Sequence, residues 1–248
     1  MLSEKIFLIP VISFSLLFVQ ISSAQIFDNP TNLQVLPKDI STAELRDSMK
    51  AMSLGTGFRC SSCHVGEEGQ PLPEYDFVSD EKELKSKARL MLGMVDAINN
   101  SHLAPLGADH VKVQCVTCHR GVNKPLMTAD VLTMAADEGG AEKMIAEYLA
   151  LREKYYGTHS YDFSEFTMSQ FAQSRAAAGE YEQARAILDI MLDENQESFM
   201  AHLMYGELEQ KSSNNTEAIR HYLKAIEINP RAHGFLGPRL EKLQAGSE

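Results

Sequence analysis

The sequence has few cysteines, no long hydrophobic run beyond its first 24 residues, and fewer basic than acidic residues. Its 23 Lys and Arg residues against 34 Asp and Glu residues give a formal net charge of −11. Phosphate backbones repel such an acidic chain, which argues against nucleic-acid binding. No segment after residue 24 offers the roughly 20 consecutive apolar residues that span a bilayer. We therefore expect a water-soluble protein without a transmembrane span.

The first 24 residues have the features of a secretory signal peptide. An apolar run over residues 6–19 follows Lys5 and precedes small residues that suit cleavage after Ala24. An uncleaved membrane anchor is the alternative, although the run is shorter than the roughly 20 residues that span a bilayer. No cysteine lies near Ala24, so attachment of a lipid there is not expected. Cleavage would release the chain into the periplasm, where its acidic surface could steer it towards a basic patch on a partner.

All four cysteines fall in two copies of one pattern, CSSCH at residues 60–64 and CVTCH at residues 115–119. The pattern Cys-x-x-Cys-His is the attachment signature of c-type haem. On one helical turn, residues i and i+3 lie on the same side, so two thiols can reach the two vinyl groups of one porphyrin edge. The histidine that follows can then bind the iron from one face. The residues predicted to bind two haem c groups are Cys60, Cys63, Cys115 and Cys118 for covalent attachment, with His64 and His119 as axial iron ligands.

Three other uses of paired cysteines explain the pattern less well. Zinc sites favour cysteine pairs roughly 12–20 residues apart, whereas 51 residues lie between Cys63 and Cys115. Disulfides suit an exported chain but do not explain a histidine at the same offset after both pairs. A thioredoxin-like redox pair requires a strand–helix–strand context, which these Gly-, Glu- and Met-rich surroundings do not indicate.

Methionines on a helix before each motif are candidates for the second axial ligand, since a Met opposite His favours ferrous iron. A capping box predicts that one helix begins at residue 41 and ends near residue 54, with Leu45, Met49 and Met52 on one face. A second helix is predicted from about residue 80, where Asp80 to Glu83 could form the cap, to about residue 98. Methionine at helical spacing is usually core packing, and that alternative stays open. The apolar face of the second helix comprises Leu84, Ala88, Met91, Met94 or Val95, and Ile98.

Three segments carry a resemblance to a known family. They are LQVLPKDISTAELRDSMKAMSLGTGFRCSSCHVGEEG from residue 33, ARLMLGMVDAIN from residue 88, and CVTCHRG from residue 115. Together, residues 33–126 resemble the cytochrome c subunit of photosynthetic reaction centres. The resemblance implies repeated helix–turn–haem units, in which each haem takes its distal methionine from the helix before its attachment motif.

Applied to this sequence, the resemblance implies Met49 opposite His64 and Met91 opposite His119. Met91 is preferred over Met94 because the family's ligand is the first methionine of its M-L-x-M segment. The photosynthetic subunit usually carries four haems, whereas this chain has two motifs, so only half of that molecule is represented and a photosynthetic role does not follow.

Two further features near the motifs are expected to have no role of their own. The family can supply a histidine to another haem from the loop before the second motif, where this chain has His102 and His110. With no third haem to receive it, both are expected to be surface or loop histidines. The segment over residues 65–78 is rich in Gly, Pro and Glu and is expected to be a loop.

The chain from Thr128 onward has no cysteine, and helical patterns dominate it. Helices are predicted over residues 141–156 and 163–178, followed by a repeat of 34 residues typical of tetratricopeptide repeats. Two such repeats fall short of the three or more usually needed for stability, so the preceding helices or the haem domain should cover an exposed end. The repeat positions are Gly206, Ala218, Tyr222, Ala225 and Pro230, and in the earlier copy Ala172, Ala184, Leu188 and Met191; residues 236–243 are expected to cap the stack.

Together these patterns predict a mainly α protein in three parts. They are a signal peptide (1–24), a dihaem cytochrome c domain (25–127) and a helical domain (128–248) with tetratricopeptide-like repeats over about residues 165–232. The predicted function is periplasmic electron transfer between redox partner proteins, one of which could be a membrane complex docked through the repeats. A concave repeat surface often holds a partner, but a helical appendage that only shields the cytochrome is an equal alternative.

Two rival functions remain. A dihaem peroxidase or reductase would keep an open axial position on one iron, against which the suitably placed methionines argue. A chiefly structural subunit would use its repeats to assemble a complex, and its haems would be incidental.

Overall fold

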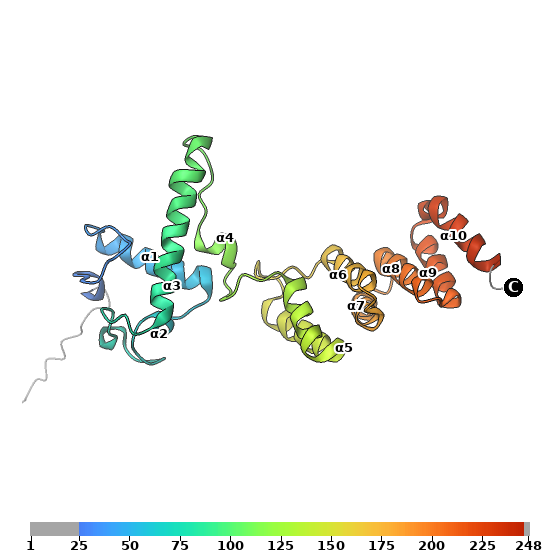
Figure 1. Cartoon of the computed structure of the whole chain (residues 1–248), viewed down its shortest axis with the longest axis horizontal. Helices are drawn as coiled ribbons and strands as arrows, with labels where there is room; N and C mark the ends of the chain where they lie inside the picture. The colour runs from blue at the N-terminus through green and yellow to red at the C-terminus, as the bar shows by residue number, and fades with distance from the viewer. Residues whose placement is uncertain (1–24, 246–248) are drawn as a thin grey trace, which may run out of the picture. The chain divides into compact units, whose positions relative to one another are not determined.

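The computed structural model describes residues 25–245, so the predicted signal peptide lies outside the described residues. Helices dominate the described chain, and its only β feature is an isolated antiparallel bridge between Val65 and Asp76. The prediction of a mainly α fold is confirmed. Within these residues, no helix is both long enough and apolar enough to cross a membrane. The chain forms two compact units (Figure 1): the first ends at Val113, and the second begins at Gln114 and also includes Leu54–Gly57.

The first unit is built on α1 (Thr42–Thr56, whose last residues belong to the second unit), α2 (Cys60–Cys63) and α3 (Glu83–Ala97). The predicted capping box starts α1: the backbone N–H of Ser41 donates to Glu44 Oε2 (3.1 Å), and that of Glu44 donates to Ser41 Oγ (3.2 Å). These bonds satisfy N–H groups that a helix start leaves without partners. The shorter elements are the 3₁₀ turns Gln25–Phe27, Leu72–Glu74 and Ala104–Leu106 and the π-helix Ile98–His102.

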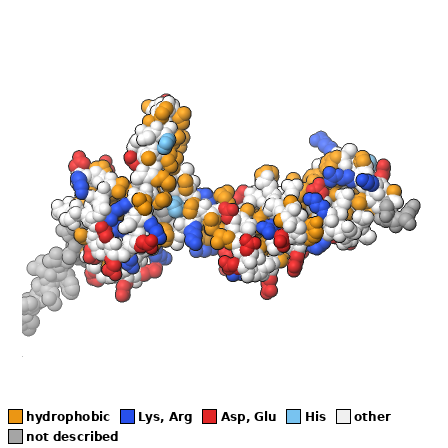
Figure 2. All heavy atoms as spheres, in the orientation of Figure 1, with side chains coloured by type: hydrophobic (Ala, Val, Ile, Leu, Met, Phe, Trp, Pro, Cys, Tyr) orange, Lys and Arg blue, Asp and Glu red, His pale blue; other side chains and the backbone are white. Residues whose placement is uncertain are grey.

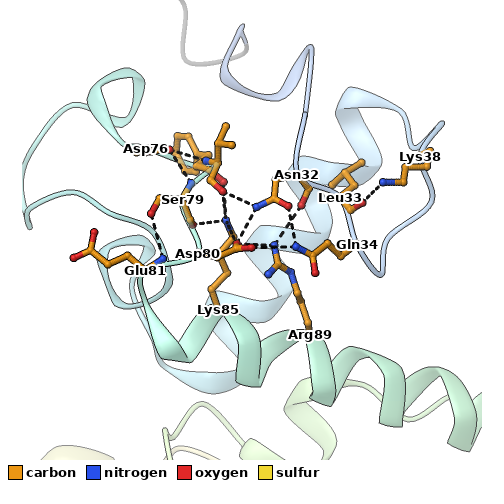
Figure 3. A network of polar contacts seen from close by, with 12 residues as sticks. Asn32, Leu33, Gln34, Lys38, Asp76, Ser79, Asp80, Glu81, Lys85 and Arg89 are labelled. Carbon is orange, nitrogen blue, oxygen red and sulfur yellow. Dashed lines mark hydrogen bonds and ion pairs between the residues drawn. The ribbon is translucent and has the colours of Figure 1, made fainter.

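The start of α3 differs from the prediction. Its N-cap is Lys82, which makes no side-chain capping bond. Asp80 instead accepts from Lys85 (3.0 Å) and Arg89 (2.9 Å), which project from α3 towards the preceding loop, and also from Asn32 (Figure 3). The predicted cap is wrong because two cations on the first turns of α3 outcompete the backbone N–H groups for this carboxylate.

The far end of α3 also differs. The helix was expected to stop at a polar break after Ile98, but it continues as the π-helix. Asn99 binds the end of the loop that follows the π-helix. Its Nδ2 donates to the Val113 carbonyl, and its Oδ1 accepts from the Val113 N–H, each at 2.8 Å. Asn99, the first polar residue after Ile98, therefore holds the loop against the helix.

The second unit contains the helices downstream of Val113. The predicted helix over residues 141–156 is the second half of α5, which already begins at Thr128. Gly139 and Gly140 have non-helical backbone angles, so the element bends there. The other helices are α4 (Cys115–His119), α6 (Glu165–Ala177), α7 (Tyr181–Glu194), α8 (Phe199–Lys211), α9 (Asn215–Ile228) and α10 (His233–Ala245), with a 3₁₀ turn over Pro230–Ala232.

Helices in the second unit recur at the predicted interval. The first residues of α6 and α8, of α7 and α9, and of α8 and α10 are each 34 positions apart. Gly206 on α8 faces the ring of Tyr222 on α9, and a Cβ at this glycine would overlap the ring. The small residue therefore lets the two helices approach closely, as the sequence suggested. Assignment to the tetratricopeptide family stays a prediction, as do the domain boundaries.

The hydrophobic core lies in the second unit. One cluster of buried side chains comes from the four helices α5, α6, α7 and α8. A second cluster comes from α9, α10 and the turn between them, and it packs against α8. In the described part of the first unit, only Leu33 and Leu45 are buried hydrophobic residues. The repeat positions Ala172, Ala184, Leu188, Met191, Ala218, Tyr222 and Ala225 are all buried.

Candidate functional site

The second Cys-x-x-Cys-His motif forms the short helix α4, and its histidine lies within the helix. Before it, the Gln114 backbone N–H donates to Thr117 Oγ1 (3.0 Å), which stabilises the helix start. After it, Arg120 adopts left-handed backbone angles and its N–H donates to the Val116 carbonyl (2.9 Å). The helix therefore ends at His119.

The side chain of His119 has a defined tautomer. Its Nδ1 lies 3.0 Å from the carbonyl oxygen of Val122, which can only accept a hydrogen bond. In the neutral ring Nδ1 therefore carries the proton, and Nε2 keeps the lone pair that a metal needs. Histidines that bind metals usually donate their other ring N–H in this way, which fixes the ring orientation. The geometry of His119 fits its predicted role as an iron ligand.

Two glycines at the end of α1 lie against this second motif. A Cβ on Gly55 would come within 2.9 Å of the Val116 nitrogen and 3.0 Å of the Cys115 Cβ. Gly57 has a left-handed φ of +71°, and a Cβ there would overlap the Gly121 carbonyl oxygen. The Gly121 N–H in turn donates to the Gly55 carbonyl (2.9 Å). The glycines predicted only to end a helix therefore also form a backbone cradle for the second motif.

The first motif differs from the second at its histidine. The helix α2 ends at Cys63, and His64 follows in an extended conformation while its N–H donates to the Cys60 carbonyl (2.9 Å). Of the two motif histidines, only His119 lies on the helical turn of its motif. The imidazole of His64 instead contacts the ring of Phe77 edge-on at 4.8 Å between centroids. The loop over residues 65–78, expected to have no role, therefore helps to hold this histidine.

The environment of His64 keeps its ring neutral. Burial, followed by the positive charges of Lys85 and Arg89, lowers the pKa of His64 to about 4. Its Nδ1 is buried and has no hydrogen-bond partner among the described residues. Neutral imidazole is the form that binds metals, so the donor chemistry of this motif also fits an iron ligand.

The four cysteines form no disulfide with one another. Burial, and then the neighbouring Cys60, raises the pKa of the Cys63 thiol, which disfavours the thiolate that zinc needs. No group of three or more His, Cys, Asp or Glu side chains within residues 25–245 could hold a metal ion. Each motif offers two thiols and one imidazole, which are the groups that a haem bound through thioethers would use: Cys60, Cys63 and His64, and Cys115, Cys118 and His119.

The predicted distal methionines lie on the two expected helices. Met49 is half-buried on α1, while Met91 and Met94 on α3 are 45% and 44% exposed. The only buried residue of α3 is Lys85, so its predicted apolar face does not pack into a protein core. Met91 belongs to the first unit and His119 to the second, and both predicted pairings, Met91 with His119 and Met49 with His64, stay predictions.

Exposed apolar side chains gather along α3 and the loop that follows it. In Figure 2, hydrophobic atoms run along this helix. His102 is exposed at the end of the π-helix, and His110 is half-buried in the loop, with Nδ1 2.6 Å from the Gly107 carbonyl. The exposed large hydrophobic residues of this region are Leu90, Met91, Met94, Leu106 and Val111.

Sequence reasoning overlooked the residues that support the motifs. On the first unit these are Lys85 and Arg89, which the sequence analysis did not single out and whose charges act on His64. On the second unit they include Arg120 and Ser160, which are 40 positions apart and joined by hydrogen bonds. The only sequence signal was the position of Arg120 directly after the motif histidine.

Comparison with known proteins shows what the N-terminal part of the chain is similar to. Residues 19–127 match the family model of the photosynthetic reaction centre cytochrome C subunit. A relative, the photosynthetic reaction center cytochrome c subunit of Roseobacter denitrificans, is 21% identical over 136 residues, which are 50% of this chain and 37% of that protein. No solved structure shows a significant match. The chain thus spans little more than a third of that relative, and its N-terminal part resembles the cytochrome c subunit of photosynthetic reaction centres.

Proposed function

We propose that this chain is an electron-transfer protein that binds two haem c groups covalently. The observation that carries the proposal is the hydrogen bond from His119 Nδ1 to the Val122 carbonyl, which leaves Nε2 free as an iron ligand beside a correctly spaced cysteine pair. The similarity to a reaction-centre cytochrome c subunit supports the same conclusion. When bound, each haem supplies a one-electron couple between ferric and ferrous iron.

The protein's residues attach, orient and shield each cofactor. Cys60 and Cys63 hold the first haem and Cys115 and Cys118 the second, in thioether bonds that prevent its loss. His64 and His119 bind the irons, each from one side. Phe77 restricts the ring of His64, and the Val122 carbonyl restricts that of His119.

The exposed apolar side of α3 supports a packing role for this helix at a cofactor. The described first unit has only two buried hydrophobic residues, although a unit of its size needs apolar burial to be stable. Met91, Met94 and Leu90 offer apolar surface to a porphyrin face. We propose Met91 as the distal ligand of the second haem and Met49 as that of the first. With a histidine and a methionine on each iron, the haems would supply electron transfer, and neither iron would offer a binding position for a substrate.

Intact mass and absorption spectra test haem attachment. The exported protein should exceed the calculated polypeptide mass by two haem groups, and its alkaline pyridine spectrum should report two haems of c type. Cys118→Ala should remove one of them. A polypeptide at its bare calculated mass would refute the proposal, and magnetic circular dichroism showing a high-spin iron would indicate the peroxidase or reductase instead.

Replacement of each methionine tests the distal ligands. Met49→His or Met91→His should lower the midpoint potential of one haem and leave attachment intact, because imidazole stabilises ferric iron better than a thioether does. Met134→His, at an exposed position on α5, is the control and should change neither potential. A shift with Met94→His but none with Met91→His would move the assignment to Met94.

We further propose that the protein acts in the periplasm and that its C-terminal helices dock a redox partner, including a membrane complex. The 34-residue recurrence of α6 to α10 supports a repeat surface of the kind that holds partners. Affinity purification of the exported protein, with and without residues 165–248, tests this role. Loss of every partner on truncation supports docking, and unchanged partners would assign the helices a shielding role.

A further inference from the structure

Arg120 follows His119 directly and has an unusual backbone. Its φ of 52° lies in the left-handed region, where only one other non-glycine residue of the described chain is found. For a residue with a Cβ this conformation is strained. Surrounding interactions must therefore hold it there, and the proposed haem attachment does not account for them.

The side chain of Arg120 provides those interactions. Its Nη1 donates to the Cys118 carbonyl (2.9 Å), its Nη2 to the Leu126 carbonyl (2.8 Å) and its Nε to the Ser160 carbonyl (3.1 Å). The hydroxyl of Ser160 returns a bond to the Arg120 carbonyl (2.8 Å). One guanidinium thus joins three separate carbonyls through N–H donors that its planar fork holds in fixed directions.

The segment that carries Ser160 is itself fixed. Ser160 is 5% exposed and lies in the connection between α5 and α6. Two residues on, the Asp162 N–H donates to Thr128 Oγ1 (3.0 Å), and that hydroxyl donates to the Asp162 carbonyl (2.9 Å). The carbonyl that Arg120 binds therefore belongs to a rigid part of the helical region.

The same turn positions the carbonyl that orients His119. The Val122 N–H donates to the His119 carbonyl (2.9 Å), and Val122 is buried. Its carbonyl oxygen accepts from His119 Nδ1. Arg120 and Gly121 connect His119 to Val122, so their backbone angles determine where the Val122 carbonyl oxygen lies relative to the His119 ring.

We propose that Arg120 is a positioning residue for the second haem. Through its bonds to Cys118, Leu126 and Ser160, it fixes the turn that aims His119 Nε2 at the iron. Ser160, from the α5–α6 connection, thereby becomes part of the haem site. This inference rests on the proposed function, because it requires a haem at the second motif.

The test uses the exported full-length protein with both haems attached. Arg120→Gly permits the left-handed backbone but removes the guanidinium, Arg120→Lys keeps the charge but loses the fork, and Ser160→Ala removes only the hydroxyl. Arg59→Gln is the control, since Arg59 precedes the first motif and its side chain pairs with Glu68 at an exposed position. Electron paramagnetic resonance and redox titration report on each haem, and His64→Ala identifies the signals of the first.

We expect Arg120→Gly and Arg120→Lys to broaden the low-spin signal of the second haem and shift its potential, with the first haem unchanged. Ser160→Ala should give a smaller change in the same direction, and Arg59→Gln should not alter the second haem. A wild-type signal in Arg120→Lys would assign the effect to charge and overturn the positioning role. If the Arg120 variants do not accumulate, an unchanged second haem in Ser160→Ala overturns it. Absence of a second haem in the wild-type protein would instead refute the proposed function.

Discussion

The glycine cradle beneath the second motif makes a quantitative prediction about Gly57→Ala. The left-handed φ of +71° at this position costs about 1–2 kcal/mol once a Cβ is present. The new methyl group would also overlap the backbone carbonyl of Gly121, which cannot rotate away as a side chain could. Overpacking of this kind typically costs about 1–3 kcal/mol. The total loss of unfolding free energy should therefore be about 2–5 kcal/mol.

Gly69→Ala is the matched control for this substitution. Gly69 also has a left-handed φ, +87°, but a Cβ there would meet no atom within 4 Å. Its cost should be the backbone strain alone, about 1–2 kcal/mol. Denaturant unfolding of the holoprotein, followed by circular dichroism and haem absorbance, measures both variants. Equal midpoints for the two variants would refute the contact between Gly57 and the second motif.

Three further predictions concern the supporting structure. Gly206→Ala should destabilise the repeat helices by about 1–3 kcal/mol, because its Cβ would overlap the Tyr222 ring; Gly234→Ala, at an open helical position, should stabilise them by up to about 1 kcal/mol in thermal unfolding. Lys85→Met should lower the free energy of unfolding in urea by roughly 2–4 kcal/mol, because the carbonyls of Phe77, Val78 and Ser79 lose their donor. Lys87→Met, at an exposed ion pair, is the control and should change stability little. Equal effects of the two substitutions would contradict the buried role of Lys85. Burial, and then the charges of Arg220 and His202, lowers the pKa of His221 from 6.5 to about 4. The folded state therefore favours the neutral imidazole, and the stability of the protein should fall as the pH drops from about 6.5 to 4. Thermal melts of His221→Gln should show a weaker pH dependence over this range, and a pH profile identical to that of the wild type would contradict the assignment.

Local patterns were enough to locate most of the helices. The capping box at Ser41 and the two Cys-x-x-Cys-His motifs are short, contiguous signals, and the helical surroundings agree with them. The sequence also predicted the 34-residue recurrence of the helices. Its signal was the spacing of small and large residues, and in the structure Gly206 faces the ring of Tyr222. In each case the physical cause lies within a few turns of one helix or in one helix pair.

The predicted cap at the start of α3 was wrong because charged side chains compete for Asp80. Asp80 looked like a capping residue, but hydrogen bonds from Arg89 and then Lys85 hold its carboxylate and lower the pKa of Asp80. The side of α3 that carries Lys85 is consequently the buried one, and the apolar side is exposed. Hydrophobic periodicity identifies an apolar face correctly, but it does not state what covers that face.

By itself, the sequence determined that cysteine pairs and histidines stand at the spacing that haem attachment needs, since that spacing is a property of a single helical turn. Only the tertiary structure decided which nitrogen of His119 is free, how Gly57 supports the second motif, and that Ser160 contacts Arg120 from 40 positions away. These features depend on backbone carbonyls brought together by folding, and every residue carries the same carbonyl. Residue identity therefore predicts the ligands, while the arrangement that orients them becomes visible only in three dimensions.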